Sequence, residues 1–229
     1  MKSGLASYGK AGRRVQVLLS AAIAAAAFLG AGLPAFTAER PVKIVVLGDS
    51  LATGLGLPTN VAFPAKLSRA LQAKGYAVEV ADAGVSGDTA SAGLARLNWS
   101  VPEGTDAVIV EFGANDALRG VDPKVTRGAL DSILRGLKTR GIEVLLAGMQ
   151  SPRNMGPDYV RGFDSIFPEL ATSHGVLFYP FFLDGVATDP KLNQRDGLHP
   201  TAAGVDVIVA RMLPKAEELV TRVRAKRPS

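Results

Sequence analysis

Short runs of aliphatic residues recur along the chain from Pro41 onward, separated by longer segments with apolar residues at every third or fourth position. The short runs are typical of strands buried on both faces, and the longer segments are typical of amphipathic helices. The expected strands are Val42–Leu47, Ala77–Ala83, Ala107–Phe112, Glu143–Ala147 and Val176–Tyr179. The expected helices are Phe63–Lys74, Thr89–Asn98, Pro123–Arg140, Asp158–Ser173 and Thr201–Arg224. This alternation predicts a parallel sheet that helices cover on both faces.

The length and continuity of the chain favour one domain. A chain of 229 residues suits a single domain with a sizeable core better than two full domains. The alternation of strands and helices continues without an internal repeat or a linker. We therefore predict an α/β fold, a single doubly wound three-layer α/β/α domain with a mostly parallel five-stranded sheet, over residues 39–229.

Residues 1–38 have the composition of a secretory signal peptide. A basic segment ends at Arg13 and Arg14, an apolar segment follows, and small residues stand near its end. We expect cleavage after Ala35 or Ala38, which would make the mature protein periplasmic or secreted. The apolar segment is also nearly long enough to span a bilayer, so an uncleaved N-terminal membrane anchor is the alternative.

The net charge of +5 suggests an acidic partner only at first sight. Four of the 26 basic residues precede Glu39 and no acidic residue does, so 22 basic residues stand against 21 acidic ones in the rest of the chain. Apart from the end of the chain at 222–227, the sequence has no basic cluster of the kind that binds nucleic acid. We expect no nucleic-acid partner.

Several kinds of chemistry are excluded by residues that the sequence lacks. The chain has no cysteine, which excludes thiol nucleophiles, disulfides and thiolate metal sites. Its only histidines, His174 and His199, are far apart in the sequence, so we expect neither a metal site nor a cofactor. The G-x-S-x-G elbow, the dinucleotide fingerprint and the Walker lysine motif are absent as well.

In an open α/β sheet, ligands bind at the carboxyl ends of the strands. The segments expected there are Gly48–Gly56, Gly84–Thr89, Gly113–Asp116 and Met149–Pro157. Ser50 follows the first expected strand in a Gly-Asp-Ser sequence, which suits either a nucleophile or an ordinary turn. The chemistry of the other loops has to decide between these interpretations.

A serine nucleophile needs a base, and histidine is the usual one. Asp196 precedes His199 by three residues, a spacing that lets a tight turn bring the carboxylate to Nδ1 of the imidazole. The alternative is that both residues simply belong to a turn or a helix start. His174 is expected at a helix end, where a positive charge is favourable, and we expect it to be structural.

The same edge of the sheet offers donors for a developing oxyanion. Gly87 lies in a glycine-bracketed loop whose backbone can approach a ligand closely. Asn115 follows the third expected strand and offers a side-chain amide. Asn115 also has a structural interpretation, since Asn115 and Asp116 could cap the next turn.

The ordered combination of these segments resembles the SGNH, or GDSL-type, hydrolase family. The resemblance runs from about Val42 to about Leu219 and rests on "LGDSL", "SGDTASAGLARL", "GANDALRG", "PFFLDGV" and "DGLHPTAAG". It is closest to the exported bacterial branch of thioesterases, arylesterases and lysophospholipases, which has a flavodoxin-like fold. Ala114 stands where that branch often has glycine, a departure that should not disturb the neighbouring amide.

The resemblance implies a role for each matching residue. Ser50 would be the nucleophile, His199 the general base, and Asp196 the carboxylate that orients it. The oxyanion hole would comprise the backbone N–H groups of Ser50 and Gly87 and the side chain of Asn115. The aspartate of the motif, next to the serine, would organise its loop rather than take part in the chemistry.

The function implied is that of a serine esterase that hydrolyses carboxylic ester and thioester bonds through an acyl-enzyme. Expected substrates are small acyl or aryl esters, acyl thioesters and lysophospholipids. We also expect the enzyme to contact lipid and to be a monomer. The segments 149–163 and 181–194 are expected to line the cleft, where Arg153 meets either a phosphate or solvent. The alternatives are an acyltransferase with the same triad and a non-catalytic exported binding protein.

Overall fold

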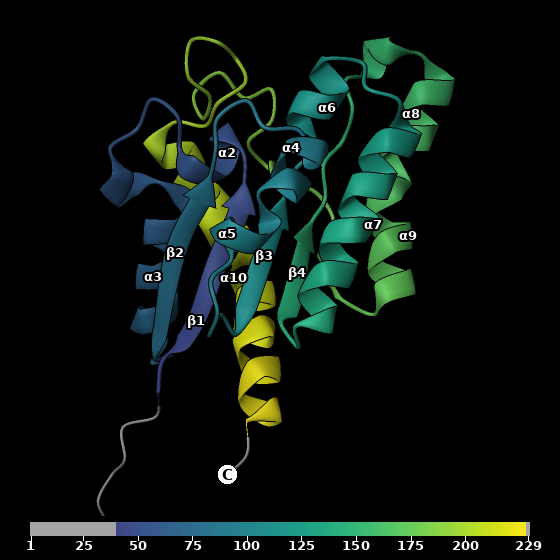
Figure 1. Cartoon of the computed structure of the whole chain (residues 1–229). Coiled ribbons are helices and arrows are strands. Elements are labelled where there is room, and N and C mark those ends of the chain that lie inside the picture. Colours follow the sequence, from purple (N-terminus) through teal and green to yellow (C-terminus); the bar gives the residue numbers. More distant parts are fainter. Residues whose placement is uncertain (1–39, 228–229) are drawn as a thin grey trace, which may run out of the picture. The chain divides into compact units, whose positions relative to one another are not determined.

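The computed structural model describes residues 40–227, which form a single α/β unit. The proposed signal peptide and its cleavage points lie outside the described residues. Five parallel strands form one sheet in the order β2-β1-β3-β4-β5 (Figure 1). The strands are β1 Val42–Gly48, β2 Val78–Gly84, β3 Ala107–Glu111, β4 Glu143–Ala147 and β5 Leu177–Tyr179. The structure confirms the predicted sheet and its parallel strands.

Helices cover both faces of this sheet. They are α2 Ser50–Thr53, α3 Phe63–Ala73, α4 Ala90–Ala95, α5 Leu97–Ser100, α6 Ala114–Leu118, α7 Pro123–Thr139, α8 Pro157–Asp164, α9 Ile166–His174 and α10 Ala202–Lys226. Two short 3₁₀ turns lie at Thr59–Val61 and Arg153–Met155. The helices α3 and α10 pack together on one face, and α4, α7 and α9 cover the other (Figure 1). The three-layer architecture is therefore confirmed.

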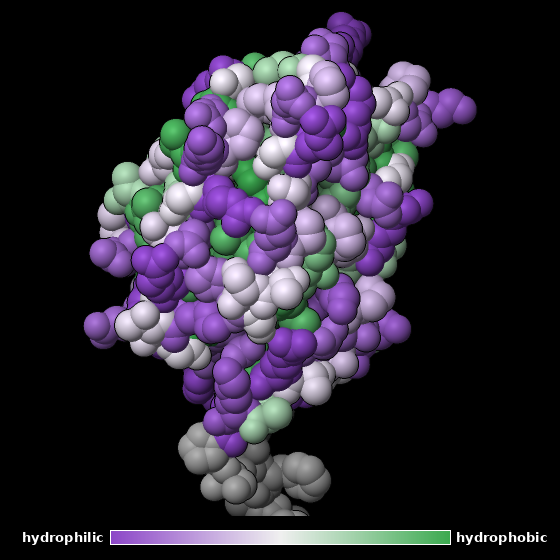
Figure 2. Space-filling model, turned by 90° about the vertical axis from the view of Figure 1, so that its right-hand side faces the viewer, coloured by the Kyte–Doolittle hydropathy of each residue, from purple (hydrophilic) through white to green (hydrophobic). Residues whose placement is uncertain are grey.

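The central strands are apolar because both of their faces are buried. Every residue of β3 is buried, and so is every residue of β1 except Lys43. Aromatic side chains from the surrounding elements complete the core, with Phe63 against Phe182 and Phe163 against Phe167. By contrast, the face that includes α8 and α9 is mainly hydrophilic, with only scattered apolar areas (Figure 2). The hydrophobic effect thus acts between the layers and holds the sheet rigid.

Two of the predicted helices are interrupted. The segment predicted as one helix at Thr89–Asn98 is divided into α4 and α5 at Arg96, whose backbone leaves the helical conformation. The segment predicted at Asp158–Ser173 is divided into α8 and α9 at Ser165. Pro168 explains the second break, because it has no N–H to donate to the carbonyl of Asp164 and its ring would clash there. The prediction that each of these segments forms one continuous helix is therefore wrong.

The strand register aligns the loops that follow the central strands. Gly48 at the end of β1 pairs with Gly84 at the end of β2 and with Glu111 at the end of β3. The next strand along the chain, β2, pairs with one side of β1, and the strand after it, β3, pairs with the other side. The order of the strands therefore reverses at β1, which makes this the topological switch point of the sheet. Ligands bind at such a point in doubly wound sheets. Within residues 40–227, no helix is long and apolar enough to cross a membrane.

Candidate active site

The chain turns sharply where β1 ends, and Ser50 lies at that turn. A Cβ added to Gly48 would lie only 2.7 Å from Ala52 Cβ and 2.7 Å from Glu111 Oε2, so the strand end passes too close to its neighbours for a side chain. Asp49 caps the short helix α2 by accepting a hydrogen bond from the N–H of Leu51 at 2.9 Å. This turn presents Ser50 at the carboxyl edge of the sheet.

Ser50, His199 and Asp196 form one hydrogen-bonded chain. Ser50 Oγ lies 2.9 Å from His199 Nε2, and His199 Nδ1 lies 2.7 Å from Asp196 Oδ2. The sequence separates Ser50 from His199 by 149 positions, so the fold alone brings them together. The arrangement suits proton transfer from a hydroxyl to an imidazole that a carboxylate orients.

The turn between Asp196 and His199 sets the charge of the carboxylate. Asp196 Oδ1 accepts the backbone N–H groups of Leu198 at 2.9 Å and of His199 at 3.0 Å. These bonds, together with the bond to the imidazole, lower the pKa of Asp196 to about 2. The ionised carboxylate can only accept, so Nδ1 of His199 carries the proton and Nε2 is left to accept one from Ser50.

Two further residues of the predicted set line the same pocket. Gly87 follows β2 with φ +87°, a left-handed conformation that favours glycine. Arg119 donates a hydrogen bond to the carbonyl of Gly87 at 2.8 Å and so holds this loop from outside. Asn115 lies in α6, and its Nδ2 donates to Asp49 Oδ2 at 3.0 Å. Both residues border the pocket together with Ser50 and His199.

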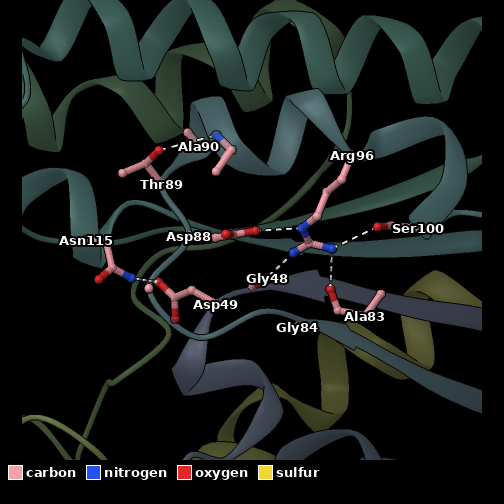
Figure 3. A network of polar contacts seen from close by, with 12 residues as sticks. Gly48, Asp49, Ala83, Gly84, Asp88, Thr89, Ala90, Arg96, Ser100 and Asn115 are labelled. Atoms are coloured by element: carbon pink, nitrogen blue, oxygen red, sulfur yellow. Dashed lines mark hydrogen bonds and ion pairs between the residues drawn. The ribbon is translucent and has the colours of Figure 1, made fainter.

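Behind these loops, the buried guanidinium of Arg96 ties the strand ends together (Figure 3). It donates to the carbonyls of Gly48 at 2.8 Å and Ala83 at 2.7 Å, and it forms an ion pair with Asp88 at 2.6 Å. Asp88 directly follows Gly87 in the chain. One side chain therefore links the loop of Ser50 to the loop of Gly87.

The pocket has a volume of about 570 Å³ and mostly apolar walls. The chain after β4 contributes one wall at 149–153, and the chain after β5 contributes another. Both walls were predicted, but the predicted residues 154–163 do not line the pocket. Apolar side chains line these walls and the mouth, among them Leu55, Leu118, Met149, Phe181, Leu183 and Leu198. This volume and lining suit the apolar part of a small ligand.

Two other candidates of the sequence analysis lie in structural contacts. His174 ends α9, near the start of β5 and so at the opposite edge of the sheet, where its Nε2 contacts Asp131 Oδ1 at 2.7 Å. Arg153 borders the pocket but pairs with Asp164 at 2.7 Å and with Gln150 at 2.8 Å. In the part of the chain that the structure describes, no group of three or more histidine, cysteine, aspartate or glutamate side chains could hold a metal ion.

Several supporting residues were missed from the sequence. Arg96 is only 5% exposed, and a single arginine among the apolar residues of "GLARL" was a usable signal for it. Gln194 joins the histidine loop to the serine loop by donating to the carbonyls of Leu55 at 2.8 Å and Pro200 at 3.0 Å. Nothing in the local sequence of Gln194 marks this role, because its partner Leu55 is 139 positions away.

The chain is similar to several known proteins. The GDSL-like Lipase/Acylhydrolase family matches residues 46–207. The chain is 41% identical over 159 residues to an arylesterase of Vibrio mimicus, a match covering 69% of this chain and 80% of the relative. It is 36% identical over 194 residues to the thioesterase 1/protease 1/lysophospholipase L1 of Escherichia coli K12, covering 84% and 92% respectively. The crystal structure of TesA matches with a TM-score of 0.74 at 35% identity, covering 77% of this chain and 99% of that one.

The fold and these relatives define an α/β enzyme that hydrolyses ester bonds. The chain belongs to the GDSL-like lipase/acylhydrolase family. The resemblance that the sequence motifs indicated is thereby confirmed, as are the predicted fold class and the general activity.

Proposed function

We propose that the chain is a serine esterase in which Ser50 is the nucleophile, His199 the general base and Asp196 its orienting carboxylate. The observation that carries this proposal is the continuous hydrogen-bonded chain from Ser50 Oγ through both imidazole nitrogens to Asp196. The proposed oxyanion donors are the backbone N–H groups of Ser50 and Gly87 and the side-chain amide of Asn115. All three residues border the same pocket.

In the first half of the reaction, Ser50 Oγ attacks the carbonyl carbon of the ester as His199 Nε2 takes its proton. The carbonyl oxygen becomes negative and is stabilised by the three donors, which act more strongly on this charge than on the neutral substrate. His199 then gives the proton to the leaving alcohol or thiol, the bond to the leaving group breaks, and an acyl-enzyme remains.

In the second half, water takes the place of the alcohol. His199 removes a proton from the water as its oxygen attacks the acyl carbon, and the same donors stabilise the second oxyanion. The bond between the acyl carbon and Ser50 Oγ breaks, and His199 returns the proton to the serine. The carboxylic acid leaves and the enzyme is regenerated without a cofactor.

The preferred substrates are aryl esters, acyl thioesters and lysophospholipids with short to medium acyl chains. The apolar walls of the pocket support this choice, since they suit an acyl or aryl group. The relatives support it too, because their names include arylesterase, thioesterase and lysophospholipase. The ion pair of Arg153 with Asp164 satisfies this arginine within the protein, so the proposal requires no phosphate contact from it.

We further propose that the enzyme is exported and acts as a monomer in the periplasm or outside the cell. The basic, then apolar, then small-residue pattern of residues 1–38 supports export. Coenzyme A thioesters would then not be its physiological substrates, even where the purified enzyme cleaves them. Lipids and small esters outside the cytoplasm fit both the compartment and the pocket.

The test uses purified residues 39–229 and p-nitrophenyl esters of increasing chain length. We expect Ser50→Ala and His199→Ala each to lower kcat by roughly 10⁶, as in a subtilisin-type triad. Asp196→Asn should cost about 10⁴, because the wrong tautomer of the base is then favoured. Release of free acid in the presence of an added alcohol distinguishes hydrolysis from acyl transfer.

The matched control is the other histidine, His174→Gln, which should leave kcat unchanged because His174 contacts only the far edge of the fold. Loss of activity in His174→Gln, with activity retained in His199→Ala, would refute the assignment of the base. Circular dichroism and the thermal midpoint of each variant exclude misfolding as the cause.

A further inference from the structure

The aspartate next to the nucleophile contacts the proposed oxyanion donor directly (Figure 3). Asp49 is completely buried, and its two carboxylate oxygens have different partners. Oδ1 accepts the N–H of Leu51 at 2.9 Å, and Oδ2 accepts the amide Nδ2 of Asn115 at 3.0 Å. The second contact joins two loops that are 66 positions apart in the sequence.

We propose that Asp49 is a positioning residue for catalysis, and that its carboxylate fixes the orientation of the Asn115 amide in the oxyanion hole. This inference rests on the proposed function of the site. A side-chain amide has a donor end and an acceptor end that can exchange places by rotation of the group. A carboxylate only accepts, so it holds the NH₂ end toward itself. One N–H of that group binds Asp49, and the other is left for the oxyanion.

Helix capping alone does not require an aspartate at this position. The helices α4 and α10 are capped by Thr89 and Thr201, whose hydroxyl groups accept a backbone N–H in the same way. A buried carboxylate costs more to desolvate than a hydroxyl. Compared with a hydroxyl cap, the carboxylate of Asp49 provides a second acceptor oxygen, and this oxygen binds Asn115.

The neighbouring Glu111 permits this arrangement only if it stays neutral when Asp49 is charged. Glu111 is also completely buried, and its Oε2 accepts the backbone N–H of Asp49 at 3.3 Å. Burial raises the pKa of Glu111 well above its usual value, and the charge of Asp49 raises it further. A neutral glutamic acid at this position leaves Asp49 as the charged partner of Asn115.

The experiment is a double-mutant cycle between positions 49 and 115, measured on p-nitrophenyl esters with residues 39–229. Asn115→Ala should lower kcat by about 10²–10³ with little change in KM, as for loss of one oxyanion donor. Asp49→Ser keeps a capping hydroxyl but loses the second acceptor, and it should lower kcat by about 10- to 1000-fold. The double variant should match Asn115→Ala within about threefold, because both changes remove the same interaction.

Asp49→Asn tests the same idea with almost no change in shape. Its one carbonyl oxygen can take the place of Oδ1 beside Leu51 or of Oδ2 beside Asn115, but not of both. Its NH₂ group then faces either the N–H of Leu51 or the NH₂ end of Asn115, and in the second case the amide of Asn115 must turn over. We expect a loss of kcat in this variant too. The matched control is Asp122→Ser, which changes a capping aspartate of the same kind at the start of α7 and should leave kcat unchanged.

Each outcome decides the question. Full kcat in Asp49→Ser, or a double variant whose loss is the product of the two single losses, would overturn the inference. If Asp49→Ser does not fold, Asp49→Asn is the deciding variant, and failure of both to fold would assign Asp49 a structural role only. Wild type and Ser50→Ala are measured in parallel. If their activities are equal, the proposed function fails, whereas a Ser50-dependent activity that is insensitive to position 49 defeats only this inference.

Discussion

Two carboxylates of the site, Asp196 and Asp49, have opposite surroundings. Asp196 is half-exposed and accepts three N–H groups, which lower its pKa to about 2. Asp49 is buried, and loss of hydration raises its pKa to about 6 in spite of the bonds from Leu51 and Asn115. At neutral pH both are ionised, one beside the proposed base and the other beside the proposed oxyanion donor.

The opposite pKa shifts predict opposite effects of pH on stability. Asp49 binds a proton more tightly in the folded state, so the free energy of unfolding should fall as pH rises from about 4 to about 6, by on the order of 3 kcal/mol. Asp196 contributes stability above about pH 4, and this contribution should be lost as pH falls toward 2. The titratable groups that face Asp49 are Glu111, Asp116 and His199.

Urea denaturation between pH 4 and 7 measures the first effect. In Asp49→Ser the fall in the free energy of unfolding between pH 4 and 6 should be smaller than in the wild type, since the buried carboxyl group with the raised pKa at position 49 is gone. Glu111→Gln serves as the second comparison, because it removes the neighbouring buried acid, whose pKa is also raised, while keeping its shape. Identical pH dependence in the wild type and Asp49→Ser would contradict a raised pKa at Asp49.

At the scale of elements, the loops of the site are held by the ends of the strands and by one buried arginine. The register places the carboxyl ends of β1, β2 and β3 side by side. Arg96, at the break between α4 and α5, then binds the carbonyls of Gly48 and Ala83 and the carboxylate of Asp88. The residue at which the predicted helix breaks is thus also the residue that holds the loops of the site together.

Replacement of this arginine should destabilise the fold strongly. Arg96→Met leaves the carboxylate of Asp88, 15% exposed, without its charged partner and removes the donor to two carbonyls. Breaking a buried pair in this way costs about 3–5 kcal/mol, which lowers the thermal midpoint by roughly 6–20 °C in a domain of this size. Differential scanning calorimetry measures the shift.

Arg161→Met is the control for this variant. Arg161 pairs with Asp158 on the surface of α8, where both side chains are largely exposed, and such pairs contribute about 0–1 kcal/mol. Equal midpoints for Arg96→Met and Arg161→Met would show that the buried network does not support the fold.

At the scale of the whole molecule, the proposed site lies entirely within the described α/β unit. All residues of the proposed site and both layers of helices belong to residues 40–227. The segment before them carries most of the excess positive charge of the chain. The proposal of export with a removable signal rests on this distribution of charge and apolar residues.

We predict that expression of the full chain in a Gram-negative host yields an exported enzyme that begins after Ala35 or Ala38. Signal peptidases cleave after small residues that follow the apolar segment. N-terminal sequencing of the periplasmic fraction, with cytoplasmic and membrane fractions as controls, measures this directly. An intact N-terminus in the membrane fraction would support the anchor instead.

The local pattern of the sequence was sufficient for the strands and for the residues of the proposed site. The predicted strands agree with the observed ones within one residue at each end. The central strands were recognisable because strands buried on both faces are continuous apolar runs. Four candidate site residues could be recognised from the sequence, because each follows or precedes a predicted element at the binding edge of the sheet. They are Ser50, Gly87, Asn115 and His199. Chain order and residue type marked them as candidates, and the resemblance to the hydrolase family implied their roles.

Only the tertiary structure decided how these residues contact one another. The bonds from Ser50 to His199 and from Asn115 to Asp49 span 149 and 66 positions, and no local pattern encodes a contact over such a distance. The break at Arg96 likewise depends on carbonyl groups of β1 and β2, which lie outside its own segment. Local propensity reflects interactions within a few residues, whereas burial and hydrogen bonding in the site depend on which strand ends pack together.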